Sequence, residues 1–209
     1  MSAEQTEIIR IENLSKSYNF KMVLDRIDLS VYENQSIAFV GHNGCGKSTL
    51  LKLAARLTRP DRGKVVHQKK LLFHYVPEHF PKMNITARKY LTSMGQLDGL
   101  PEAEINEKIE ELSAELFMSD MMTTPMKHLS KGTLQKVGVI QALLSKPEVL
   151  LLDEPLSGQD TDSQAVFIGK VNELRRQGVT VLMSCHEQHL IDRVSDTVYR
   201  INDGRILSC

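Results

Sequence analysis

Residues 41–48 read Gly-His-Asn-Gly-Cys-Gly-Lys-Ser, directly after the short apolar run of residues 37–40. Leucines at helical spacing follow, so the octapeptide joins a predicted buried strand to a predicted helix. The pattern G-x-x-x-x-G-K-S in this context is typical of a phosphate-binding loop. Its glycines let backbone N–H groups point at a phosphate, and the helix adds its positive end. We predict a nucleotide site with Lys47 on the β and γ phosphates and the Ser48 hydroxyl on Mg²⁺.

Two carboxylates follow a second buried strand. Residues 149–152 are apolar, and Asp153 and Glu154 come directly after them. In phosphoryl-transfer sites an acid of this kind holds Mg²⁺, a role that we assign to Asp153 acting through water. Glu154 is placed to polarise the attacking water as a general base. A strand that ends in exposed acids is common by itself, and the phosphate loop is what favours the functional interpretation here.

The rest of the chain is organised as an α/β domain. The first thirty or so residues alternate apolar and charged side chains, which predicts antiparallel strands. Residues 84–145 show helical spacing without good strand candidates, whereas strand character returns at residues 179–183 and 198–201. Strands that alternate with helices favour a mostly parallel sheet. We expect one domain over residues 1–209, with a helical insertion.

Composition excludes several classes of protein. The 26 Lys and Arg balance 26 Asp and Glu, which argues against a general nucleic-acid binder. With 41% apolar and 25% charged residues a packed core is expected. No apolar run approaches the roughly 20 residues of a membrane span, and residues 1–6 lack the apolar core of a signal peptide. The three cysteines, Cys45, Cys185 and Cys209, are too scattered for a disulfide framework, which fits a reducing cytosol.

The zero net charge is a cancellation of two blocks. Residues 41–82 hold nine Lys or Arg and two acidic residues, whereas residues 98–120 hold one Lys and eight acidic residues. The positive block begins at the phosphate loop and suits a negatively charged nucleotide. The negative block is interpreted as the solvated face of the inserted helix.

With these motifs placed, the sequence resembles the nucleotide-binding subunit of an ATP-binding-cassette (ABC) transporter along essentially its whole length. The most diagnostic element is Leu-Ser-Lys-Gly-Thr at residues 129–133. It resembles the LSGGQ signature of the family, with Lys131 and Thr133 where glycine and glutamine are usual. Ser130 and the backbone of Gly132 at a helix N-terminus would form a second phosphate-binding surface. In the family this surface caps ATP that is held by the other subunit.

Three further positions match the family. Tyr18 resembles the aromatic residue that stacks on adenine, although an ordinary edge-strand tyrosine is the alternative. His186 resembles the switch histidine that touches the γ-phosphate, and the alternative is a packed or capping histidine. Residues 157–160 resemble the loop that crosses the dimer interface. The acid of that loop, Asp160, could equally cap the next helix.

One position departs from the family in a way that bears on function. Residues 75–78, Tyr-Val-Pro-Glu, occupy the place of the glutamine loop, but Glu78 stands where glutamine is usual. A carboxylate can offer an oxygen to Mg²⁺, yet it adds charge beside Asp153 and Glu154 and cannot donate as an amide does. Similar Pro-Glu loops occur in ABC ATPases that pair with export-type membrane subunits. The resemblance therefore favours export.

The resemblance implies a P-loop NTPase fold with an ABC ATPase core, in which an N-terminal antiparallel β subdomain accompanies the mostly parallel sheet. Residues 1–79 and 146–209 would form the core, and residues 80–145 the helical subdomain. It also implies an ATPase that uses ATP and Mg²⁺ at two composite sites in a homo- or heterodimer and drives transport by integral membrane permease subunits. Such a protein is cytoplasmic and peripheral to the inner face of the membrane. The alternatives are a soluble non-transport ABC ATPase, acting on ribosomes or DNA, and an ATP-dependent regulatory switch.

The candidate residues fall into five groups. The catalytic candidates are Lys47, Glu154 and His186. The ATP-binding candidates are Tyr18, Gly41, His42, Asn43, Gly44, Cys45, Gly46, Lys47, Ser48, Thr49 and Glu78. The signature candidates are Leu129, Ser130, Lys131, Gly132 and Thr133, and the dimer-loop candidates are Ser157 and Asp160. The metal candidates are Ser48, Asp153 and Glu78.

Methionines are concentrated in the predicted helical insertion, which holds six of the nine. They are Met83, Met94, Met118, Met121, Met122 and Met126. Because methionine is flexible and common on surfaces that accept varied partners, some of them are candidates for a groove that receives a membrane-subunit helix. The alternative for any one of them is a gap-filling position in the core.

Overall fold

The computed structural model describes residues 6–208. Residues 1–5 and Cys209, which entered the predictions above, lie outside this range. The central sheet has six strands in the order β5-β6-β7-β3-β8-β9. They are β3 (Ser36–Val40), β5 (Phe73–Val76), β6 (Val149–Asp153), β7 (Thr180–Ser184), β8 (Thr197–Asn202) and β9 (Arg205–Ser208). All pairings are parallel except that of β8 with β9, so the predicted mostly parallel sheet is confirmed.

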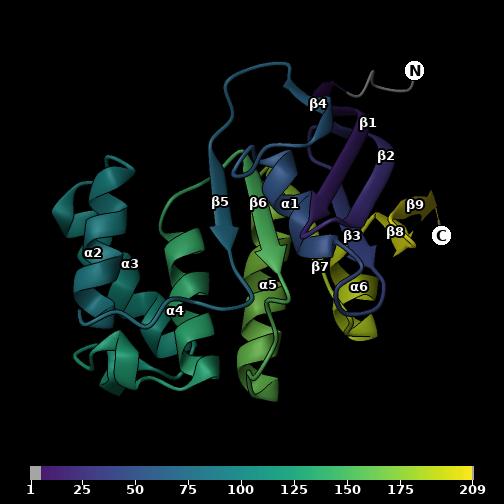
Figure 1. The fold of residues 1–209 in the computed structure, drawn as a ribbon. Coiled ribbons are helices and arrows are strands. Elements are labelled where there is room, and N and C mark those ends of the chain that lie inside the picture. The colour runs from purple at the N-terminus through teal and green to yellow at the C-terminus, as the bar shows by residue number, and fades with distance from the viewer. Residues whose placement is uncertain (1–5, 209) are drawn as a thin grey trace.

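A second sheet is antiparallel and lies beside the first. Its order is β2-β1-β4, with β1 (Glu7–Tyr18), β2 (Lys21–Tyr32) and β4 (Arg62–His67). Figure 1 shows this sheet on one side of the molecule and the helices α2, α3 and α4 on the other, beyond β5. The helices are α1 (Lys47–Ala54), α2 (Ala87–Leu97), α3 (Glu102–Glu115), α4 (Lys131–Leu144), α5 (Thr161–Arg176) and α6 (Gln188–Val194). Two short 3₁₀ helices, η1 (Ser119–Met121) and η2 (Met126–His128), lie between α3 and α4.

The parallel sheet is covered on both faces, which its sequence pattern explains. Successive side chains of a strand point to opposite faces. In β6, Leu150 and Leu152 pack into a cluster with residues of α2 to α6, whereas Val149 and Leu151 pack into a cluster with α1 and the antiparallel sheet. All four side chains are at most 1% exposed. A strand that is buried on both faces therefore reads as an unbroken apolar run.

Several elements differ from those that the sequence predicts. Strands β4 and β5 and helix α6 are additional, and β4 begins at Arg62. Helix α1 ends at Ala54, because the φ of 56° at Arg56 is incompatible with a continuing right-handed helix, and Leu57 beyond it is 60% exposed. A turn with φ 48° at Asp203 and 74° at Gly204 joins β8 to β9. Short elements are set by tertiary packing more than by local periodicity.

The methionines of the helical segment divide between core and surface. Met118, Met122 and Met126 are at most 2% exposed and belong to the core cluster, so for these three the groove hypothesis is wrong. Met121 is 46% exposed, and Met83 is partly buried against the same cluster. In residues 6–208, no helix has both the length and the apolar character that crossing a bilayer requires.

Candidate functional site

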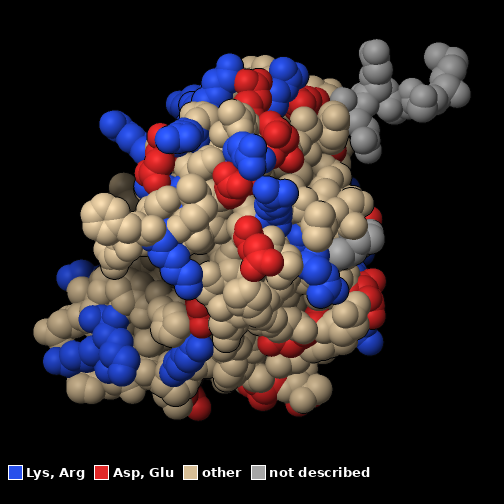
Figure 2. Space-filling model, turned by 45° about the vertical axis from the view of Figure 1, so that its right-hand side comes forward, with Lys and Arg blue, Asp and Glu red and all other residues tan. Residues whose placement is uncertain are grey.

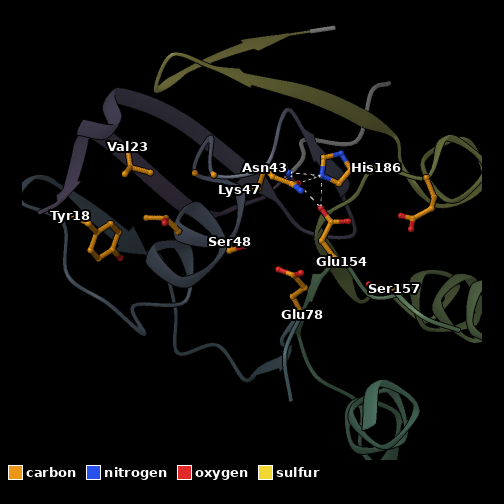
Figure 3. Close-up of a pocket in the computed structure, with 13 residues that line it drawn as sticks. Tyr18, Val23, Asn43, Lys47, Ser48, Glu78, Glu154, Ser157 and His186 are labelled. Atoms are coloured by element: carbon orange, nitrogen blue, oxygen red, sulfur yellow. Dashed lines mark hydrogen bonds and ion pairs between the residues drawn. The ribbon is translucent and has the colours of Figure 1, made fainter. Parts of the chain in front are cut away.

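A cavity of about 650 Å³ opens where the loop before α1 meets the carboxyl ends of β5, β6 and β7. Figure 3 shows the lining side chains converging from these elements and from the β1–β2 hairpin. The lining residues are Tyr18, Val23, Asn43, Gly44, Gly46, Lys47, Ser48, Thr49, Glu78, Glu154, Ser157, His186 and Glu187. The carboxyl edge of a parallel sheet is where ligands bind in open α/β folds. Eleven of these residues were predicted from sequence.

The loop at residues 41–48 wraps tightly because its glycines allow it. Gly46 has φ 114°, a conformation that L side chains rarely adopt, and a Cβ there would lie 2.8 Å from Leu24 Cδ2. The ammonium group of Lys47 donates to the carbonyl oxygen of Gly41 at 2.9 Å, and this side chain is only 6% exposed. Cys45 is buried in the core beneath the loop. The loop thus holds its lysine facing the cavity, where a phosphate chain would bind.

Asp153 is the centre of a hydrogen-bond network at the end of β6. Its Oδ1 accepts from the Ser48 hydroxyl at 2.8 Å and from the Ser184 hydroxyl at 2.6 Å, while Oδ2 accepts from the Tyr75 hydroxyl at 2.9 Å. One carboxylate and one hydroxyl side by side are hard oxygen donors, the ligands that Mg²⁺ prefers. Within residues 6–208 no group of three or more His, Cys, Asp or Glu forms a metal cage. Mg²⁺ held by one or two carboxylates together with substrate phosphates suits this donor set.

Tyr75 and Ser184 are contacts of Asp153 that the sequence analysis missed. Tyr75 lies on β5, 78 residues before Asp153, and parallel pairing of β5 with β6 brings the two together. Burial beside Asp153 raises the pKa of the Tyr75 phenol, so its hydroxyl stays protonated and donates. Ser184 ends β7 and also accepts a hydrogen bond from the backbone N–H of Glu154 at 3.1 Å. In the sequence, the one indication that Ser184 lies at the site was its position two residues before His186.

The Tyr75 contact predicts a measurable effect on metal binding. In Tyr75→Phe, Asp153 Oδ2 loses its donor but the ring still fills the same space. We expect the Mg²⁺ concentration for half-maximal ATP hydrolysis to rise about 3- to 10-fold, because the free energy of one hydrogen bond to a charged group is lost. Titration of activity with Mg²⁺ and of Mn²⁺ binding by electron paramagnetic resonance both measure it. Unchanged metal affinity would refute this role.

The side chains of Glu154 and His186 are in contact beside the loop at residues 41–48. Glu154 Oε1 lies 3.1 Å from His186 Nε2 and 3.5 Å from Lys47 Nζ, and it has no hydrogen bond of good geometry within the described residues. His186 Nε2 also lies 2.9 Å from Asn43 Oδ1. Burial raises the pKa of the Glu154 carboxyl, against the opposing effect of His186 and Lys47. A raised pKa brings a carboxylate base closer to the operating pH.

The backbone at Glu154 is unusual. Its φ of 48° lies in the left-handed region, which non-glycine residues seldom occupy. The N–H of Glu154 donates to the carbonyl oxygen of Ser184 at 3.1 Å, so the end of β7 fixes this conformation. Strain of this kind is found where the surrounding structure imposes it, often in active sites.

Tyr18 lies at the far end of the cavity from Glu154, as Figure 3 shows. Its ring is 46% exposed, and Lys16 Nζ stands 5.3 Å from the ring centroid. Asp61 holds that ammonium group at 2.8 Å. An exposed aromatic face at the end of a polar cavity can stack on a planar ring such as a nucleobase.

Residues 129–133 lie outside the cavity lining. Ser130 caps α4, since its Oγ accepts from the backbone N–H of Thr133 at 3.1 Å. Lys131 donates to the Ser157 hydroxyl at 2.9 Å, which ties the start of α4 to the loop after β6. Gly132 lies so close to this loop that a Cβ would stand 2.1 Å from the carbonyl oxygen of Gly158.

Asp160 caps α5, which was the structural alternative for this residue. Its Oδ1 accepts from the backbone N–H of Ser163 at 2.9 Å, and its Oδ2 accepts from Lys136 at 2.8 Å. The hydrogen bond from Lys136 lowers the pKa of the Asp160 carboxyl. Neither Asp160 nor Asp153 lines the cavity, and Gly41, His42 and Cys45 do not line it either.

The face of the molecule drawn in Figure 2 is mixed in charge. Figure 2 shows Lys and Arg side chains interspersed with Asp and Glu over the face that it presents, without a continuous field of one sign. A mixed surface of this kind agrees with the zero formal net charge of the whole chain.

Comparisons with known proteins agree with this geometry. The family model described as "ABC transporter" matches residues 24–157. The zinc import ATP-binding protein ZnuC of Mannheimia succiniciproducens is 35% identical over 93% of this chain and 73% of its own length. The spermidine/putrescine import ATP-binding protein PotA of Marinobacter nauticus is 32% identical over 95% of this chain. The chain spans 56% of the length of that second relative.

A solved structure described as that of an ATP-binding subunit of an ABC transporter superimposes on the chain with a TM-score of 0.86. The two sequences are 27% identical, and the match covers 95% of this chain and 88% of the other. The similarity thus extends over both sheets and the helices.

Proposed function

The chain belongs to the ABC transporter family of ATP-binding proteins, and on that basis we propose that it closes as a pair around two ATP molecules to drive transport by separate membrane subunits. It is an ATPase whose hydrolysis is coupled to transport. The observation that carries the proposal is the cavity in which Lys47, Ser48 and Glu154 converge with Tyr18. Glu154 lies more than 100 residues after the other three in the sequence.

We propose that ATP lies along this cavity from Tyr18 to Glu154. Tyr18 stacks on the base, the backbone of residues 41–49 surrounds the phosphates, and Lys47 contacts the β and γ phosphates. Ser48 and Glu78 would supply oxygen ligands for Mg²⁺ and Asp153 would hold it through water, and the bound ion would neutralise charge on the phosphates. The hydroxyl and carboxylate oxygens around Asp153 support this assignment.

Hydrolysis needs a base, and Glu154 is proposed for it. Its Oε1 is buried against His186 and Lys47 without a good hydrogen bond among the described residues. The side chain lines the cavity, where its carboxylate would accept a proton from water. His186 is proposed to touch the γ-phosphate, and its 3.1 Å contact with Glu154 keeps the two groups together. Lys47 and the N-terminus of α1 lower the barrier by stabilising charge that develops on the γ-phosphoryl oxygens.

Residues 129–133 are proposed to cap the ATP of a second subunit, identical or not. They lie at a helix N-terminus outside the cavity lining of their own chain, and such a terminus attracts a phosphate. Ser157 and Asp160 belong to the neighbouring loop and are proposed to lie at the same interface. Residues 80–145 would then move as a helical subdomain relative to residues 1–79 and 146–209.

The sequence predicts a direction of transport but no cargo. The Pro-Glu loop at Glu78 favours export, whereas two relatives carry the word import in their names. We propose that membrane permease subunits hold the chain at the inner face of the membrane and determine both properties. Reconstitution with the permease in inverted vesicles would determine the direction by the side on which cargo accumulates.

The paired site predicts a dependence on protein concentration. If each site takes its signature from a partner, the specific ATPase activity of the isolated chain rises with its concentration and levels off as dimers fill. We expect the activity per molecule to increase at least about 10-fold between protein concentrations well below and well above the dimer Kd. Activity that is independent of concentration, with a monomer in sedimentation, would rule out the paired site.

A further inference from the structure

Negative charge in the nucleotide cavity is unevenly compensated. Three carboxylates line it: Glu78, Glu154 and Glu187. Glu154 is close to two nitrogen groups, Lys47 at 3.5 Å and His186 at 3.1 Å. Glu78 is not in contact with either of them, and Figure 3 shows it at the opposite wall of the cavity from His186. A carboxylate without a cation beside a polyphosphate would repel it.

One lysine reaches Glu78 from another element. Lys131 Nζ lies 3.9 Å from Glu78 Oε1, and its side chain is 48% exposed while that of Glu78 is 39% exposed. The same ammonium group donates to Ser157 Oγ at 2.9 Å. The loop after β5, the start of α4 and the loop after β6 therefore meet at Lys131. His79 Nδ1 lies 3.6 Å from the other oxygen of Glu78, but its ring is 74% exposed.

We propose that Lys131 is a positioning residue of the nucleotide site. Its ammonium group offsets the charge of the Glu78 carboxylate before nucleotide binds and keeps that carboxylate at the wall where phosphates and metal arrive. This inference rests on the proposed ATP-binding function. Lys131 and Glu78 both depart from the family pattern, since each carries a charge where a neutral residue is usual. The proposal explains the two departures together, because the charges are opposite and lie next to each other.

The ion pair of Lys131 with Glu78 also links the arrival of nucleotide and metal to the helical segment. If Glu78 holds Mg²⁺, its carboxylate would no longer need the charge of Lys131, and the Lys131 ammonium group would be free to leave it. Since Lys131 is the first residue of α4, the release loosens one link between α4 and the loop that carries Glu78. Occupancy of the cavity is in this way communicated to the helical segment through one ion pair.

Binding of ATP to four proteins tests the electrostatic part: the wild type, the two single variants and the double variant. In EDTA and low salt, Lys131→Met is expected to raise the Kd for ATP about 3- to 10-fold, because Glu78 is left uncompensated. In a Glu78→Gln background the same change should alter the Kd less than about twofold. Saturating Mg²⁺ should shrink the Lys131→Met penalty to a similar value. Isothermal titration calorimetry measures all four proteins, and the series is repeated with His79→Ala to remove the second neighbour of Glu78.

Lys127→Met is the matched control. Lys127 is an exposed lysine of the same helical segment, on η2, and its loss should leave the Kd unchanged. An equal Lys131→Met penalty in the wild-type and Glu78→Gln backgrounds would overturn the proposal, as would an equal penalty for Lys127→Met.

A second measurement does not depend on ATP binding. A carbodiimide joins a lysine to a carboxylate only when the two are in contact, so mass spectrometry of treated nucleotide-free protein should find a Glu78 to Lys131 link. ATP with Mg²⁺, added to Glu154→Gln protein so that it persists, should lower the yield of that link. Absence of the link in nucleotide-free protein overturns the inference whatever the affinity for ATP. Its presence in a protein that binds no ATP would overturn the proposed function, and with it the positioning role.

Discussion

Glu154→Gln protein is expected to bind ATP with nearly wild-type affinity and to hydrolyse it about 10²- to 10⁴-fold more slowly, the usual contribution of general base catalysis. Glutamine keeps the size of the side chain but cannot take a proton from water. The left-handed backbone at residue 154 and its bonds to Ser184 do not depend on the carboxylate. Because ATP persists, the variant should accumulate as an ATP-bound dimer in size-exclusion chromatography.

The pH profile separates loss of the base from general damage. Burial raises the pKa of Glu154, so the wild-type rate should fall on acidification at a pH above the ordinary range of glutamate, as the base becomes protonated. This limb should be absent from the residual activity of Glu154→Gln. Glu187→Gln removes another carboxylate of the same cavity and serves as the control. It should keep the limb but shift it to lower pH, because the charge of Glu187 contributes to the raised pKa of Glu154. Wild-type turnover by Glu154→Gln would exclude the base role.

Gly132→Ala is expected to force the start of α4 and the loop after β6 apart. Its Cβ would stand 2.1 Å from the carbonyl oxygen and 3.0 Å from the carbonyl carbon of Gly158, so two backbone segments must separate. Overpacking of this kind costs about 1–3 kcal/mol of the free energy of unfolding. The start of α4 would move away from the loop at Ser157, and we expect ATP-driven dimerisation to be lost while the monomer still binds ATP.

A matched control variant is expected to change the free energy of unfolding in the opposite direction. Gly169 lies inside α5, and a Cβ there would meet nothing within 4 Å. Gly169→Ala should therefore stabilise the protein by about 0.5–1 kcal/mol, because alanine favours the helix. Urea unfolding of both variants, with sedimentation of each in the presence of ATP, measures the two effects. A Gly132→Ala protein as stable as wild type and dimeric with ATP would contradict the close packing of these backbones.

The sequence alone was enough to predict the parts of the site that lie within one short stretch. Residues 41–48 and residues 149–154 each run from a buried strand into a functional loop, so backbone geometry places their side chains without help from elsewhere. The mostly parallel sheet was predictable for the same reason, because each of its longer apolar strands can be recognised within one short stretch of sequence. The short strand β5 was not predicted, because four residues carry little periodicity. The contact of Tyr75 with Asp153 depends on that strand and was therefore not predicted either.

The sequence by itself therefore determined the family, the phosphate loop and the acidic strand end, since each is a pattern of adjacent residues whose chemistry requires that spacing. Tertiary structure decided which distant groups meet: Tyr75 with Asp153, Glu78 with Lys131, and Gly132 with Gly158. The physical reason is that these contacts depend on strand order and helix packing. The parallel pairing of β5 with β6 and the approach of α4 to the loop after β6 bring them within reach, and no local pattern records that arrangement.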